Sequence, residues 1–220
     1  MKILLYIEAL FTEAKDSERF DVTKVEEATT KSLYISFTET MPPPKVELRY
    51  PERDWRRSWK RSVAGVLGKV ARNILFLLLH DRVATRERGH RLMPGRYESL
   101  TCPRCWQDIE TQIHRYATCS FVQEAWGTLR FFIDRLEPGL VTISDKSLLH
   151  LDYPGVVRGD TILWLLGSYL EYVEQEVVLQ GRRVSSDGLL GFFKFKKIEC
   201  RYIAMPEIGF IPGLETTGIG

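Results

Sequence analysis

Apolar residues recur three and four positions apart between residues 55 and 78, and this spacing predicts an amphipathic helix, or two in succession. Basic residues occupy many of the positions between them, so the outer face of this region is expected to be positively charged. Gly65 and Gly68 lie inside the pattern, and because glycine destabilises a helix interior, a break near them is the alternative. The apolar positions are Trp55, Trp59, Val63, Val66, Leu67, Val70, Ile74, Leu75 and Leu78.

Further helices are predicted on both sides of a cysteine-rich segment. A short helix is expected to end near residue 92, and an apolar stripe over 121–136 predicts a longer one. Two more helices are expected after residue 160, separated by a glycine stop. The residues expected to cap or stop these helices are Thr85, Pro138, Gly139, Asp160, Gly181 and Asp187.

A triple proline in the sequence MPPPK at 41–45 bars a helix and marks a linker. The residues before it contain only short apolar pieces that do not resemble a complete fold, and the glycine-rich tail is expected to be flexible. The predicted divisions are 1–44, a partial N-terminal segment and linker; 45–140, a basic helical domain that contains the cysteines; 141–206, a C-terminal helical extension; and 207–220, a flexible tail.

Composition narrows the class of protein. The longest apolar runs, such as residues 74–79, are far shorter than the roughly 20 residues that cross a bilayer. We therefore expect no membrane span, and the N-terminus lacks the cleavage site of a secretory signal. The protein is predicted to be intracellular, in the nucleus or cytoplasm. Clustered cysteines in such a reducing compartment favour metal binding over disulfides.

Charge is distributed unevenly along the chain. Residues 45–101 carry 14 Lys and Arg against 6 Asp and Glu, whereas the residues on either side of this segment carry an excess of acidic side chains. A basic segment of this kind favours a surface that meets a polyanion, because Lys and Arg replace the counterions of phosphates. The alternative is that these side chains form ordinary solvated faces of helices.

Cys102, Cys105, His114 and Cys119 have the spacing C-x2-C-x8-H-x4-C, which is typical of a zinc site. Two thiolates separated by two residues can turn back on one ion, and the later histidine and cysteine can close a tetrahedron. Because four protein ligands leave no place for an activated water, the predicted zinc is structural.

Two alternatives to zinc stay open for these residues. The cysteines can be buried thiols beside a hydrogen-bonded histidine, or the C-x2-C pair can be a redox motif, although such motifs accompany a βαβ pattern that is not seen here. Glu110 lies four residues before His114 and is expected to orient the free N–H of its ring. The alternative for Glu110 is a solvated carboxylate.

Three stretches together resemble a known family: DWRRSWKR, then NILFLLLHDRVATRERGHRL, then CPRCWQDIETQIHRYATCSFVQEAW. They are similar to the zinc-binding region downstream of the reverse transcriptase domain in non-LTR (LINE-type) retrotransposon proteins. The resemblance covers residues 54–136, and Gly89 departs from it because the family usually has leucine there. The matching motif positions are Cys102, Cys105, Glu110, Thr111, His114, Cys119 and Trp126.

The resemblance implies a module that helps its polymerase hold template RNA or target DNA. The chain has no YxDD polymerase motif, endonuclease carboxylate set or RNase H signature, so we expect it not to be an enzyme. Its expected partners are nucleic acid and the reverse transcriptase domain of the same polyprotein. The cations expected to contact nucleic acid are Arg56, Arg57, Lys60, Arg61, Lys69, Arg72, Arg82, Arg86, Arg88, Arg91, Arg104 and Arg115.

The predicted fold class is mainly α: a helical hairpin with a small zinc knuckle insert, followed by a C-terminal helical pair. The alternative function is a zinc-stapled protein-interaction module that docks onto a polymerase or host partner.

Several other residues have structural interpretations. His80 and Asp81 are expected at a helix end, and Trp55 and Trp59 in the core rather than against bases. The others are Glu171, Glu174 and Glu176, predicted on a solvated face, and Cys200, predicted as a core thiol.

Overall fold

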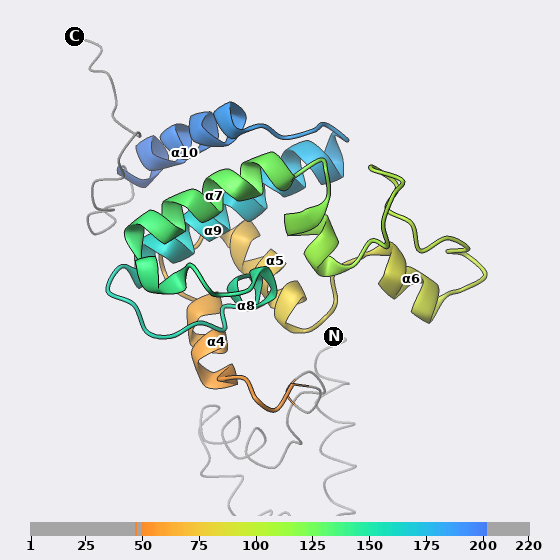
Figure 1. Ribbon diagram of the computed structural model, residues 1–220, viewed down its shortest axis with the longest axis horizontal. Coiled ribbons are helices and arrows are strands. Elements are labelled where there is room, and N and C mark those ends of the chain that lie inside the picture. Colours follow the sequence, from red (N-terminus) through yellow and green to blue (C-terminus); the bar gives the residue numbers. More distant parts are fainter. Residues whose placement is uncertain (1–46, 48–49, 202–220) are drawn as a thin grey trace, which may run out of the picture. The chain divides into compact units, whose positions relative to one another are not determined.

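The structure of the protein is a computed structural model that describes Glu47 and residues 50–201, with side chains to residue 197 (Figure 1). The chain divides into two compact units, Met1–Pro44 and Lys45–Gly220, and the described residues belong to the second. The predictions for the first 44 residues, for Cys200 and for the tail lie outside what is described. Among the described residues, none of the helices has the length and apolar character needed to cross a bilayer.

The described part of the chain is mainly α-helical, which confirms the predicted class. Within it, extended pairing is limited to a bridge between Thr101 and Ile109 at the base of the cysteine-rich loop. The elements are α4 Trp55–Ser62, α5 Lys69–Leu79, α6 Arg86–Leu92, a π-helical turn His114–Thr118, α7 Gln123–Leu136, a 3-10 turn Pro138–Leu140, α8 Asp145–Leu149, α9 Gly159–Val173, a π-helical turn Glu174–Leu179, and α10 Ser186–Arg201.

Helix α9 is the centre of the core. Residues 162–171 of this helix are all buried, because α5, α7 and α10 pack around it (Figure 1). A helix that is apolar around most of its circumference has to be covered in this way. Among the described residues, the larger of the two buried apolar clusters runs from Leu67 to Phe193 and so crosses the boundary predicted at residue 140.

The predicted helix over 55–78 is two helices, separated at the two glycines. The chain leaves α4 after Ser62 and enters α5 at Lys69. The break shifts the phase of the apolar pattern, so Val63 and Val70 are 68% and 49% exposed rather than buried.

The predicted cap at Thr85 is confirmed, since its hydroxyl accepts a hydrogen bond from the backbone N–H of Arg88.

The N-terminus of α5 is capped from a distant part of the chain. The Glu171 carboxylate on α9 is buried, accepts a hydrogen bond from the N–H of Ala71 at 3.2 Å, and pairs with Lys196 at 2.8 Å. Gly68 precedes α5 and has no side chain to cap it, and a Cβ there would lie 2.5 Å from the same carboxylate. The prediction that Glu171 lies on a solvated face is therefore wrong. The carboxylate of Glu174 also has a partner inside the protein, because it accepts a hydrogen bond from the hydroxyl of Tyr116.

Gly89, where the resembling family has leucine, lies beneath an aromatic ring. A Cβ at this position would be 2.8 Å from the ring of Tyr97. The ring of Tyr97 therefore occupies the space that a larger side chain at position 89 would need.

Replacing Gly167 by alanine is expected to destabilise the protein by about 1–3 kcal/mol, because it overpacks the contact between α9 and α5. The new Cβ would lie 2.6 Å from Leu67 and 3.1 Å from Ala71, both buried. Gly127→Ala on α7 is the matched control, since nothing lies within 4 Å of its Cβ position, and helix propensity predicts no loss. Denaturant unfolding of the full chain measures both. Equal midpoints for the two variants would contradict the proposed close contact.

Candidate metal centre

The two cysteines of the C-x2-C pair lie on a tight turn. The N–H of Cys102 donates to the carbonyl of Asp108 at 2.8 Å, and the N–H of Trp106 donates to the carbonyl of Cys102 at 3.0 Å. Trp106 closes the turn with a φ of +58°, in the left-handed region that bulky residues rarely adopt. The turn directs the backbone amides of Gln107 and Asp108 toward the sulfur of Cys105.

A helix cap positions His114. Thr111 lies at the N-terminus of the next helical turn, and its hydroxyl accepts a hydrogen bond from the N–H of His114 at 3.0 Å. A threonine hydroxyl that accepts from the backbone N–H three residues later is an ordinary N-cap arrangement, so the spacing T-x-x-H is the signal for this role. The turn ends at Cys119, whose N–H donates to the carbonyl of His114.

These elements bring the four predicted ligands together. Their ligand atoms all lie within 4.8 Å of one another, so the cluster can hold one metal ion. The sulfurs of Cys102 and Cys119 are 3.9 Å apart, and the sulfur of Cys105 is 3.2 Å from Nε2 of His114. Cys102, His114 and Cys119 are buried, and Cys105 is partly buried.

The separations can be compared with those that zinc requires. With Zn–S bonds of about 2.3 Å and a Zn–N bond of about 2.0–2.1 Å, a regular tetrahedron separates two sulfurs by about 3.8 Å and sulfur from nitrogen by about 3.5–3.6 Å. The Cys102–Cys119 pair matches this closely, and the Cys105–His114 pair is within a few tenths of an ångström. Three thiols and one imidazole also form a donor set that suits zinc better than magnesium or calcium.

The protonation of the thiols is perturbed in opposite directions. Burial raises the pKa of Cys119 to about 12, and the nearby sulfurs of Cys102 and Cys105 act in the same direction. Burial also acts to raise the pKa of Cys105, but hydrogen bonds from the amides of Gln107 and Asp108, together with those from Cys102 and Cys119, lower it overall. A divalent cation supplies the positive charge that buried thiolates need.

Glu110 does not orient His114, contrary to the expectation from its spacing. Its two carboxylate oxygens accept hydrogen bonds from the N–H of Arg86 at 2.8 Å and from the guanidinium of Arg104 at 2.6 Å. Glu110 therefore ties the start of α6 to the knuckle. Nδ1 of His114 lies instead 3.8 Å from the exposed carboxylate of Asp108 and 3.5 Å from the hydroxyl of Thr118, two residues that no sequence pattern singles out.

Comparisons with protein-family models, with curated proteins and with solved structures found no match for this chain. The resemblance to the retrotransposon zinc-binding region therefore depends on the motif residues alone. Trp126, the last of these, is buried on α7 with its ring centroid 5.3 Å from that of Tyr169 on α9.

Three of the cations predicted to contact nucleic acid are used inside the protein. Arg61 donates to three backbone carbonyls of residues 151–154 at 2.7–2.9 Å and lies over the ring of Tyr153. Arg115 is buried and donates to the carbonyl of Ala84, and Arg104 bonds Glu110. A guanidinium whose N–H donors already have carbonyl or carboxylate acceptors has few donors available for a phosphate. Arg61, Arg104 and Arg115 are therefore removed from the set of residues predicted to contact nucleic acid.

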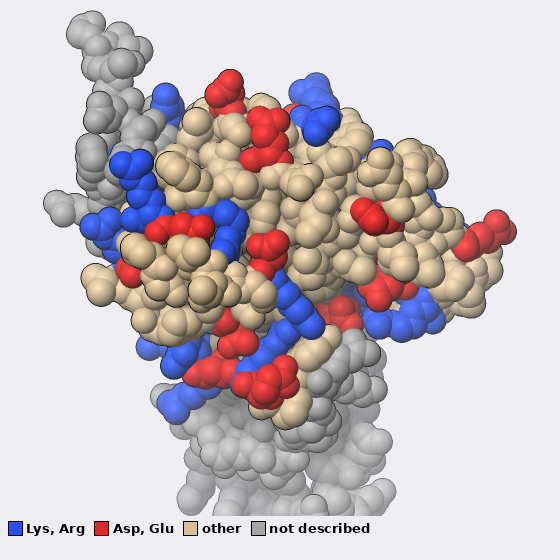
Figure 2. Space-filling model, viewed as in Figure 1, with Lys and Arg blue, Asp and Glu red and all other residues tan. Residues whose placement is uncertain are grey.

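Other predicted cations are paired near the surface. Arg57 lies 3.1 Å from the carboxylate of Asp54, Arg88 donates to the carbonyl of Asp81, and Arg91 lies 3.4 Å from the carboxylate of Asp81. On the face shown in Figure 2, Lys and Arg are interspersed with Asp and Glu. The guanidinium of Arg86 lies 5.6 Å from the centre of the Tyr97 ring. The remaining predicted cations are all exposed: Arg56, Lys60, Lys69, Arg72 and Arg82.

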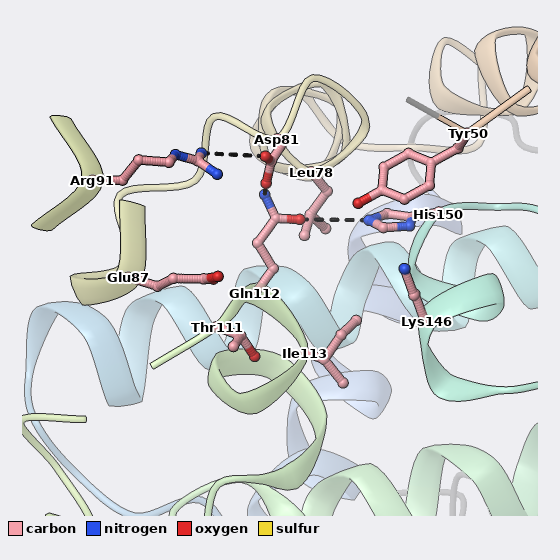
Figure 3. A pocket seen from close by; sticks show the side chains of 10 residues that line it. All are labelled: Tyr50, Leu78, Asp81, Glu87, Arg91, Thr111, Gln112, Ile113, Lys146 and His150. Carbon is pink, nitrogen blue, oxygen red and sulfur yellow. Dashed lines mark hydrogen bonds and ion pairs between the residues drawn. The ribbon is translucent and has the colours of Figure 1, made fainter. Parts of the chain in front are cut away.

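A pocket of about 250 Å³ lies between α5, α6 and α8, and Figure 3 shows the side chains that line it. A chain of interactions crosses it: Arg91 pairs with Asp81, Gln112 donates to Asp81 at 3.0 Å, and Gln112 lies 3.4 Å from His150. Asp81 has the role expected of it at the end of α5, with a φ of +53° and a side chain that joins α5 to α6 and to the turn that carries His114. This network connects the end of α5, helix α6 and the residue after α8 to the segment that carries His114.

Proposed function

We propose that the chain is a nucleic-acid-binding module built around one structural zinc ion. The ion would be held by Cys102, Cys105, His114 and Cys119, with the hairpin of α4 and α5 before the knuckle and the helices α9 and α10 after it. The observation that supports the zinc assignment is that three thiols and one imidazole place their ligand atoms within 4.8 Å of one another, with two of the separations close to those of a zinc tetrahedron. All four positions are protein ligands, so the ion organises the fold and has no open site for chemistry.

The zinc would stabilise the platform on which the exposed cations lie. Cys102, Cys119, Tyr116 and Ala117 belong to the same buried core as the inner residues of α5, so a fixed knuckle also fixes α5. Exposed Arg56 and Lys60 on α4 and Lys69 and Arg72 on α5 provide positive charge on consecutive helices. Contacts of this kind attract a phosphate backbone and carry little sequence information, so we expect binding of modest selectivity.

The double variant Arg56→Ala with Lys60→Ala is expected to weaken RNA binding and to make it less sensitive to salt. Removing one cation that neutralises a phosphate of a single strand reduces the slope of log affinity against log salt by about 0.7, so removing two reduces it by about 1.4. Fluorescence anisotropy of the full zinc-loaded chain, over a range of salt concentrations, measures the slope.

The matched control removes two exposed cations elsewhere, with Arg183→Ala and Lys194→Ala next to or within α10. Helix α10 lies at the opposite side of the bundle from α4 (Figure 1), so the slope should stay at its wild-type value. An affinity that does not fall with salt in the wild-type chain would overturn the nucleic-acid proposal.

One observation favours the alternative of a protein-interaction module. Trp106 on the knuckle turn and Ile109 at its base are 73% and 51% exposed, and the exposed Asp108 lies between them in the sequence. An exposed apolar surface of this kind fits a protein partner better than a phosphate backbone. Trp106→Ala distinguishes the two functions, because it should leave RNA affinity unchanged and abolish binding of a reverse transcriptase domain that docks there.

A further inference from the structure

Four aromatic rings form a continuous row across α4 and the end of α5. The ring centroids of Trp55 and Trp59 are 5.7 Å apart, those of Trp59 and His80 are 4.9 Å apart, and those of His80 and Phe76 are 4.2 Å apart. The row begins in the core, where Trp55 is 7% exposed, and ends at the surface, where Phe76 is 52% exposed. We refer to these four residues as the aromatic row.

The inner rings of the row are fixed by hydrogen bonds at their edges. Nε1 of Trp55 donates to the carbonyl of Tyr50 at 2.9 Å, and Nε1 of Trp59 donates to the carboxylate of Glu47 at 2.7 Å. These bonds fix the positions of the two indoles. The fixed indoles in turn support the rings of His80 and Phe76 through ring contacts. The outermost ring is therefore presented on a rigid base, at little cost in conformational entropy when something binds to it.

His80 extends the row as a neutral ring at neutral pH. Burial lowers its pKa, and the charge of nearby Arg82 lowers it further, while Glu47 acts in the opposite direction. A neutral imidazole stacks on its neighbours without the hydration that an imidazolium demands.

Cations border the exposed end of the row. On α5, Lys69, Arg72 and Phe76 are spaced by three and four residues and so share a face, and all three are exposed. On α4, exposed Lys60 directly follows Trp59 in the sequence. Aromatic rings interleaved with Lys and Arg are the arrangement by which proteins bind single strands, with bases on the rings and phosphates on the cations.

We infer that the aromatic row is a stacking platform for an unpaired base of single-stranded RNA or DNA, with Phe76 as the contacting ring and Arg72 and Lys69 as phosphate partners. The inference rests on the proposed function and names its ligand class. Duplex bases are already stacked on one another and cannot use an exposed phenyl ring, so the platform should prefer single strands.

The test compares a short oligo(dT) strand with a duplex of the same length, each titrated against the full zinc-loaded chain at fixed salt. Phe76→Leu keeps an apolar side chain and removes the ring, and it should weaken binding of the single strand about tenfold, within the range found for one stacked base. Phe76→Tyr keeps the ring and should bind as the wild-type chain does. The slope against salt should be the same for all three, because each retains every cation that meets a phosphate.

Phe131→Leu is the matched control. Phe131 on α7 is 58% exposed and also rests against another aromatic ring, that of Phe132 at 5.8 Å, but the row does not include it. Its replacement should leave binding unchanged. If single strands bind with a salt-dependent affinity and Phe76→Leu binds as tightly as wild type, the inference is overturned and the proposed function stands. If neither strand nor duplex binds, both fail.

Discussion

Chelation of zinc, or replacement of Cys105 by serine, is expected to unfold residues 95–125 and to lower the thermal stability of the whole chain. Structural zinc contributes an apparent 10–16 kcal/mol or so in small zinc domains, because binding and folding are the same event there. Here the large core around α9 can persist, so the loss should be local in the knuckle and smaller in the rest. Hydrogen exchange measures this: amides of residues 100–118 should lose protection, whereas those of α9 keep it.

The control for the cysteine substitution is Cys200→Ser, which removes the cysteine that is not part of the C-x2-C-x8-H-x4-C motif. Metal analysis should find one zinc per chain in the wild type and in Cys200→Ser, and much less than one in Cys105→Ser. Cobalt substitution adds a spectroscopic readout of tetrahedral thiolate ligation. An unchanged thermal midpoint after chelation would exclude the structural zinc.

The cluster of candidate metal ligands could be predicted from the sequence because all four residues lie in one short segment and are positioned by local interactions. A tight turn holds Cys102 and Cys105, and a threonine cap places His114 three residues later. Turns and helix caps are formed by residues that are close in the sequence, so their sequence patterns can be recognised. The confirmed cap at Thr85 is another example. The helical class could be predicted for the same reason, since apolar periodicity is a property of neighbouring residues.

The features that the sequence did not reveal depend on contacts between distant residues. Arg61 looks like any basic residue of an amphipathic helix, but its acceptors include the carbonyl of Leu151, 90 positions away. Glu171 lies among other carboxylates with helical spacing, yet it caps α5 through the N–H of Ala71, 100 positions away. Single-residue charge does not distinguish a solvated side chain from one that satisfies a buried backbone, so charge counting overestimated the basic surface.

The polar network in the pocket has a definite protonation state, which follows from its hydrogen-bond donors. The guanidinium of Arg53 can only donate, and it lies 2.6 Å from Nδ1 of His150, so that nitrogen accepts. Nε2 of His150 must then carry the proton, which it directs toward the side-chain oxygen of Gln112 at 3.4 Å. The amide nitrogen of Gln112 donates in turn to Asp81. His150 is therefore neutral in the folded protein, and Figure 3 shows its contact with Gln112.

Acidification from pH 7 to pH 5 is expected to destabilise the fold through His150. Burial, helped by the charges of Arg53 and Lys146, lowers the pKa of His150 to about 3, against about 6.5 in the unfolded chain. Between these values the unfolded chain binds a proton that the folded chain refuses, so stability falls as the pH falls. At pH 5 the loss attributable to this group is about 2 kcal/mol, and it is absent above the unfolded pKa.

The variant His150→Gln isolates this contribution, because an amide can accept from Arg53 and donate to Gln112 but does not titrate. We expect it to be somewhat less stable than the wild type at pH 7 and to lose that disadvantage by pH 5, as the wild type weakens. Zinc release at low pH affects both proteins alike, so the difference between their unfolding free energies, measured in excess zinc, reports on His150 alone. His90→Gln on α6 lies outside the network and should retain the wild-type dependence. A constant difference between His150→Gln and the wild type from pH 7 to pH 5 would show that His150 is not held neutral by its surroundings.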